Sequence, residues 1–110
     1  MSAPAESISP KEVSLPLNPQ HIRKTAVILR AINHPLRQQI LQIIFSKQKI
    51  TVTELYIALR LEQSVASQHL AILRRAGFVK THRNGKFIQY SVSEKKIESL
   101  EQLIGTFLSA

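Results

Sequence analysis

The stretch TVTELYIALRLEQSVASQHLAILRRAG, residues 51–77, predicts two helices with almost nothing between them. Thr51 followed three residues later by Glu54 is a capping box, in which two side chains satisfy backbone N–H groups at a helix start. The β-branched residues around it favour a strand, so Ile50 is expected to add a residue or two of strand before the helix. The first predicted helix covers about 52–60. Its inward-facing side chains are expected to be Leu55, Ala58 and Leu59.

The second helix of this stretch is predicted from about Ser64 to Ala76, and Gly77 is its stop. Its expected core side chains are Val65, Ala66, Leu70, Leu73 and Ala76. Its opposite side carries Gln63, Ser64, Ser67 and Gln68, then Arg74 and Arg75 at the far end. Small polar side chains allow a helix to enter the major groove of DNA, where Gln pairs with adenine and Ser bonds a base or a phosphate. An ordinary solvated helix face is the alternative interpretation.

His69 stands beside Leu70, at the boundary between the core face and the polar face of this helix. A histidine in this position is expected to be partly buried and to bond the backbone of a neighbouring element. A metal ligand or a base-reading side chain is the alternative role.

Two extended runs follow, residues 78–83 and 86–92, joined by Asn84-Gly85. Asn-Gly between alternating strands predicts a hairpin with a type I′ turn. In that register Val79 is opposite Tyr90, and Thr81 is opposite Ile88. The cations at its tip suit a wing that reaches the minor groove or flanking phosphates, although a turn charged for solubility has the same composition. The tip residues are His82, Arg83, Asn84 and Lys86.

Three further helices are predicted around this centre. The first begins after Asn18-Pro19, an N-cap followed by proline at the first helical position, and ends near Ile32. The second covers about 35–47, and the last covers about 94–108. The apolar positions of the first helix are Ile22, Ala26, Leu29 and Ile32. Those of the second are Leu36, Ile40, Ile43 and Ile44. Those of the last are Ile97, Leu100, Leu103, Ile104, Phe107 and Leu108.

The order of elements is therefore helix, helix, helix-turn-helix, hairpin, helix, which predicts a mainly α winged helix-turn-helix with five helices. The apolar stripes of the first and last helices are wide for so small a core. We expect them to form a dimer with a second copy, while completion of the monomer core is the alternative. Four of the five prolines lie within the first nineteen residues. We therefore expect a disordered tail over 1–18, followed by a single domain over 19–110.

The net charge of +8 is concentrated in the middle of the chain. Residues 20–93 hold twelve Lys or Arg against only Glu54 and Glu62, whereas each end of the chain has a net charge of −1. A basic body between near-neutral ends indicates a polyanion such as nucleic acid, or simply a basic surface without a partner. No apolar run approaches the ~18 residues of a membrane span, and no secretory signal is seen, so a cytoplasmic protein without a membrane partner is expected.

Catalysis has little support in the sequence. The chain has no cysteine, no aspartate and only three glycines, which excludes a thiol nucleophile and a Gly-rich phosphate loop. Ser64 and Ser67 share a helix with His69, but their spacing is poor for a nucleophile–base pair. We therefore expect a binding protein rather than an enzyme, without a cofactor. The classes left open are a DNA-binding regulator, a general nucleic-acid-binding protein and a winged-helix module that binds other proteins.

The runs LRAINHPLRQQILQII and LEQSVASQHLAILRRAGFVKTHRNGKFIQYSVS resemble the ArsR family of bacterial winged-helix repressors, over roughly residues 22–108. The resemblance implies a homodimer that represses transcription from inverted-repeat operators in double-stranded DNA. It places Gln63, Ser64, Ser67 and Gln68 at the family's major-groove positions. It places Arg83, Asn84 and Lys86 at the tip of the wing.

Many members of that family sense metals, and here the sequence departs from the pattern. Where a Cys-x-Cys-Asp motif would begin the third helix, this chain has Thr51, Thr53 and Glu54. Threonine hydroxyls are poor ligands for the metals that thiolate and imidazole bind. A second family site uses Asp and His on the last helix, and residues 94–110 contain neither. We therefore expect no metal site, and the sequence does not identify an effector.

Overall fold

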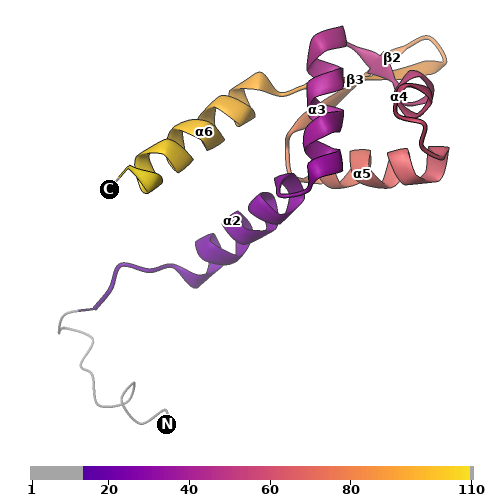
Figure 1. Cartoon of the computed structure of the whole chain (residues 1–110). Helices are drawn as coiled ribbons and strands as arrows, with labels where there is room; N and C mark the ends of the chain where they lie inside the picture. The colour runs from indigo at the N-terminus through magenta and orange to yellow at the C-terminus, as the bar shows by residue number, and fades with distance from the viewer. Residues whose placement is uncertain (1–13, 110) are drawn as a thin grey trace.

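The computed structural model describes residues 14–109 and has the predicted winged helix-turn-helix order (Figure 1). Its elements are α2 (Pro19–Ile32), α3 (Pro35–Lys47), β1 (Ile50–Thr51), α4 (Val52–Leu59), α5 (Gln63–Arg75), β2 (Val79–Asn84), β3 (Phe87–Val92) and α6 (Glu94–Leu108). Of the tail predicted over 1–18, residues 1–13 lie outside the described residues, and 14–18 form an exposed segment without regular structure. None of the described helices is long and apolar enough to cross a membrane.

The strand signal and the capping box at the start of α4 are both confirmed. Ile50 pairs with Tyr90 of β3, so β1 becomes the third strand of the wing sheet. One residue later, the Thr51 hydroxyl accepts a hydrogen bond from the Glu54 N–H at 3.2 Å, and the Glu54 carboxylate accepts one from the Thr51 N–H at 2.9 Å. The chain therefore turns from strand into helix without a loop, which fixes the helix-turn-helix against the wing.

The core lies where α3, α4 and α5 meet the base of the sheet. Its largest fully buried side chains are Phe78, Ile40, Ile44, Leu55, Leu70 and Leu73. The prediction that Ala58 faces inward is wrong, since this residue is exposed. On a helix, Val52 and Leu59 lie to one side of Leu55 and Ala58 lies to the other. Because Val52 and Leu59 pack against the core, α4 is turned so that Ala58 faces away.

The predicted register of the hairpin is also wrong. Val79 pairs with Val92 and Thr81 pairs with Tyr90, so the two-residue loop is Gly85-Lys86 rather than Asn84-Gly85. Gly85 has φ +64° and Lys86 has no positive φ, which is the pattern of a type II′ turn with glycine first. The shift is two residues along β3. Since side chains alternate along a strand, the same residues still face the core.

The first and last helices leave much of their apolar surface uncovered. On α2, the side chains that pack against the body are Ile28, Ala31 and Ile32, so only one member of the predicted stripe contributes. On α6, no described residue is fully buried. Figure 1 shows both helices running away from the body on the same side. The large exposed apolar residues of the two helices are Ile22, Val27, Leu29, Leu103, Phe107 and Leu108.

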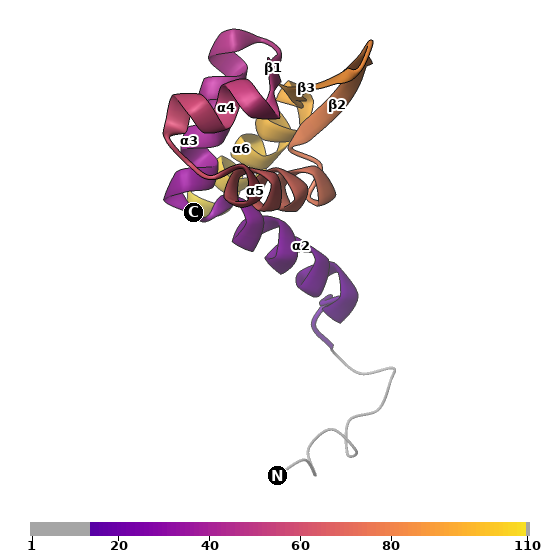
Figure 2. The same ribbon diagram turned by 90° about the vertical axis from the view of Figure 1, so that its right-hand side faces the viewer.

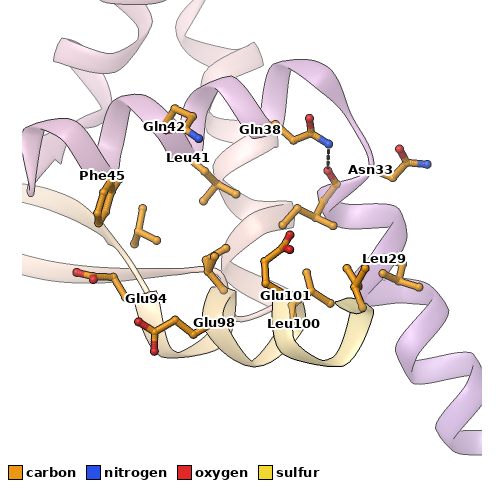
Figure 3. A pocket seen from close by; sticks show the side chains of 14 residues that line it. Leu29, Asn33, Gln38, Leu41, Gln42, Phe45, Glu94, Glu98, Leu100 and Glu101 are labelled. Atoms are coloured by element: carbon orange, nitrogen blue, oxygen red, sulfur yellow. Dashed lines mark hydrogen bonds between the residues drawn. The ribbon is translucent and has the colours of Figure 1, made fainter. Parts of the chain in front are cut away.

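A groove of about 860 Å³ lies between α2, α3 and α6 (Figure 3). Leu29, Leu41 and Phe45 are among the apolar side chains that line it. Gln38 also lines it and donates to the Ile32 carbonyl at 2.9 Å. The α6 side of the groove carries three carboxylates, those of Glu94, Glu98 and Glu101.

Candidate nucleic-acid interface

Helix α5 presents the polar face that the sequence predicts. Ala66, Leu70 and Leu73 are buried beneath it. The predicted contact residues Gln63, Ser64, Ser67, Gln68 and Arg74 are all exposed, as is Arg75. Glu62, the N-cap residue, makes no side-chain bond to the first turn, and its exposed carboxylate lies at the start of this face. Nothing bulky stands on the N-terminal half of this face to keep it from a groove.

The wing stands beside α5, and Figure 2 shows it projecting beyond the body. Arg83, Asn84 and Lys86 are exposed at its tip. The Arg83 guanidinium lies 3.4 Å from the Gly85 carbonyl oxygen, and the Lys86 ammonium lies 6.0 Å from the centre of the Phe87 ring. His82 is instead half-buried, and its Nε2 lies 2.7 Å from the Ser91 hydroxyl of the neighbouring strand. The tip therefore offers two exposed cations, Arg83 and Lys86, while His82 belongs to the sheet.

The three helices α2, α3 and α5 carry only positive charges. Helices α2, α3 and α5 contain no acidic residue at all. Their seven cations are Arg23, Lys24, Arg30, Arg37, Lys47, Arg74 and Arg75. Of the two acids between residues 20 and 93, Glu54 is engaged in the cap of α4, where hydrogen bonds from Thr51 hold its carboxyl pKa below the usual value. The other acid, Glu62, is exposed at the N-cap of α5, so a polyanion on this surface would meet one carboxylate among these cations.

His69 lies at the edge of the core face, as predicted, but its partner is a side chain and not a backbone group. Its Nδ1 is 3.2 Å from Nη1 of Arg37, and its ring centre is 5.0 Å from that of His34. Partial burial lowers the pKa of His69, and the charges of His34 and Arg37 lower it further. The sequence prediction had the position of this histidine right and its bonding partner wrong.

Arg37 is the residue of this region that the sequence interpretation missed. Its Nε donates to the Ala31 carbonyl at 2.6 Å, and its Nη2 donates to the Arg30 carbonyl at 3.2 Å. One signal was available in the sequence. Arg37 stands in the first turn of a helix, where the helix dipole disfavours a cation, so some other group has to hold it.

The positions at which the resemblance to the ArsR family would place metal ligands are occupied by the α4 cap. Thr51 and Glu54 bond each other there, and Thr53 is exposed. Within residues 14–109, no three His, Asp or Glu side chains come together in a way that could hold a metal ion.

Comparison with known proteins gives a consistent result. Residues 34–81 match the family described as "Bacterial regulatory protein, arsR family". The chain is 34% identical over 93 residues to the transcriptional activator HlyU of Vibrio cholerae, covering 81% of this chain and 85% of that protein. It is 33% identical over 79 residues to the transcriptional repressor PagR of Bacillus anthracis, covering 72% of this chain and 79% of that protein. Among solved structures, NolR from Sinorhizobium fredii superposes with a TM-score of 0.69 at 30% identity, covering 88% of this chain and 99% of that one.

Proposed function

Because the chain belongs to the ArsR family, and is therefore a DNA-binding transcriptional regulator and not an enzyme, we propose that it is a homodimeric repressor of an inverted-repeat operator. Two surfaces of the chain, the polar face of α5 and the apolar groove, are open to contact. They suit a protein that represses transcription by occupying its operator. HlyU is named an activator, so activation from the same kind of site is the second candidate. Since a transcriptional regulator has to reach its DNA, we propose that this protein is cytoplasmic.

The observation that carries this proposal is the joint exposure of the α5 polar face and the wing tip. We assign base reading in the major groove to Gln63 and Gln68, since an amide can make two hydrogen bonds to adenine. Ser64 and Ser67 are short enough to bond either a base edge or a phosphate. The contacts to phosphates and to the minor groove are assigned to Arg74, Arg83, Asn84 and Lys86.

The proposed dimer rests on the groove between α2, α3 and α6. Glu94, Glu98 and Glu101 are spaced four and three residues apart, so they share one face of α6 along the edge of the groove. An occupant should be apolar on one side and basic on the other. Helix α2 of a second copy has that character, with three cations, no acid and an uncovered apolar surface. In a twofold dimer each copy would give its α2 and receive the other, so the contact is made twice.

The effector of this regulator is proposed not to be a metal. The sequence has no cysteine, so the thiolate sensor site of metal-responsive relatives cannot form. The oxygens of Thr51 and Glu54 at that position are already bonded to each other in the α4 cap. Large thermal stabilisation by Zn²⁺, lost when two histidines are replaced, would contradict this part of the proposal.

Footprinting of genomic fragments selected by the protein tests the whole proposal. We expect two protected half-sites related by inverted symmetry, with centres about one helical turn apart. Affinity for that fragment should fall steeply with salt, since the predicted contacts include many phosphates. Equal affinity for random DNA of the same length, with no protected repeat, would refute specific regulation and favour a general nucleic-acid-binding protein. A chain that binds no DNA in moderate salt would instead be an interaction module.

A further inference from the structure

Arg37 ties three segments of the body together. Two of its nitrogens donate to the carbonyls of Arg30 and Ala31, in the last turn of α2. Carbonyls at a helix end have no partner within the helix, and a cation is favourable beside them, so the guanidinium is firmly held from this side. Its third contact, from Nη1, crosses to His69 of α5.

This third contact differs in kind from the others that α5 makes. Ala66, Leu70 and Leu73 bury α5 against the core, but apolar packing has no preferred direction. Among the side-chain hydrogen bonds of residues 14–109, the bond from Arg37 to His69 is the one that joins a side chain of α5 to another element. His69 is the immediate neighbour of Gln68 on the exposed face. A hydrogen bond requires a narrow range of distance and angle, so this contact restricts rotation of α5 about its own axis.

We propose that Arg37 is a positioning residue which, through neutral His69, holds α5 at the angle that operator discrimination requires, without touching DNA itself. The inference rests on the proposed function, because it needs α5 to be the helix that reads DNA. The expected signature is a loss of discrimination between operator and unrelated DNA, with less change in affinity for unrelated DNA.

The contact depends on the protonation state of His69. Arginine can only donate hydrogen bonds, so Nδ1 must carry a lone pair and the ring hydrogen must lie on Nε2. A proton on Nδ1 removes the acceptor and places a second positive charge beside Arg37. His34 adds to the repulsion from the same side, and its own Nδ1 accepts from the Leu36 N–H at 3.2 Å.

Other charged groups surround this cluster at greater remove. Those on the elements packed against α5 are His21, Arg23, Lys24 and Arg30 of α2, Lys47 of α3, Glu54 and Tyr56 of α4, and Lys80, His82 and Arg83 of β2, with Arg74 and Arg75 on α5 itself. The charges that act on the pKa of His69 are those of His34 and Arg37, which follow burial as its causes. All three lower it. The His69 ring is therefore fully neutral above the ordinary histidine pKa of 6.5. The bond to Arg37 is lost as the pH falls below 6.5 and passes through the lowered pKa.

The test measures the ratio of dissociation constants for unrelated DNA and operator, by fluorescence anisotropy between pH 5 and 8 at constant ionic strength. For the wild type we expect the ratio to fall about tenfold from pH 7.5 to the acid limit, the loss of one hydrogen bond to a charged group. His69→Asn places an amide oxygen where Nδ1 stood, and should keep the high ratio at every pH. His69→Leu should give the low ratio at every pH. His34→Asn keeps the N-cap acceptor of α3 and should keep the fall in the ratio, with its midpoint moved to higher pH because one charge that lowers the pKa of His69 is gone.

Each outcome decides the inference. A His69→Asn profile that still falls with acid like that of the wild type would overturn it, as would a wild-type ratio in His69→Leu. If His69→Leu does not fold, judged by its circular dichroism and melting curve, the Asn variant alone decides. A wild-type ratio near one at all pH values would overturn the proposed function and this inference together, whereas a high, pH-independent wild-type ratio overturns only the inference.

Discussion

Phe107 offers the sharpest test of the proposed dimer. Its side chain is 80% exposed in the single chain, and it lies one turn beyond Ile104, which lines the groove on the same face of α6. Such exposure of a phenylalanine on an apolar stripe is explained if a second copy covers it. Phe107→Ala removes most of that contact and leaves the helix intact, because alanine is the best helix former.

The magnitude follows from the uncovered surface. Full burial of a phenylalanine side chain contributes up to about 3 kcal/mol, and four-fifths of that remains available in the single chain, or about 2 kcal/mol. A twofold dimer contains the contact twice, so the variant should lose about 4 kcal/mol of association free energy. This corresponds to a dimer dissociation constant about a thousandfold higher.

Sedimentation velocity over a range of concentrations measures this constant. Ile57→Ala is the matched control, since Ile57 is 64% exposed on α4, away from the groove, and should leave the constant unchanged. A wild type that stays monomeric at tens of micromolar would refute the dimer. Equal dissociation constants for wild type and Phe107→Ala would refute the role of this face.

Three further outcomes are expected. Gln68→Ala should relax sequence preference in competition binding, whereas Lys86→Ala should weaken all sequences alike; the reverse pattern would show that helix and wing are wrongly assigned. Thr51→Ala should lower the free energy of unfolding by about 1 kcal/mol in urea titrations, while Thr53→Ala, exposed and outside the cap, should change it little. Because hydrogen bonds lower the pKa of Glu54, the stability that this carboxylate gives is present above the ordinary value and is lost as pH falls below it, so the effect of Thr51→Ala should shrink in acid.

The elements and the α5 face could be predicted because local signals agreed with tertiary packing. The capping box at Thr51 and the proline at position 19 mark helix starts, and helical spacing separates Leu70 and Leu73 from Gln68. The hairpin register could not be read locally. Asn84-Gly85 and Gly85-Lys86 are both acceptable loops, and the pairing of Ile50 with Tyr90 together with the bond from the Ser93 N–H to the Phe78 carbonyl accompanies the second.

The contact between Arg37 and His69 could not be predicted from the sequence. The two residues are 32 positions apart, and neither the helix period nor a motif spacing links them. Only an indirect clue existed, a cation where the helix dipole disfavours one. Contacts between side chains of different helices depend on how those helices cross, which one sequence does not specify. The prediction that Ala58 faces the core was wrong for the same reason, because the rotation of α4 is set by its packing partners.

The distribution of acidic residues connects the two proposed interactions. Residues 14–109 hold five glutamates, and three of them lie along the α6 side of the groove. A surface that meets phosphates is favoured by having few carboxylates, whereas the groove can use them to select a basic partner helix. DNA binding and dimer formation then share one dependence on salt, since both pair cations with anions. Below the dimer dissociation constant, salt weakens both steps, so the logarithmic salt slope of operator binding should be steeper than above it. Equal salt slopes below and above the dimer dissociation constant would show that the groove carboxylates take no part in dimer formation.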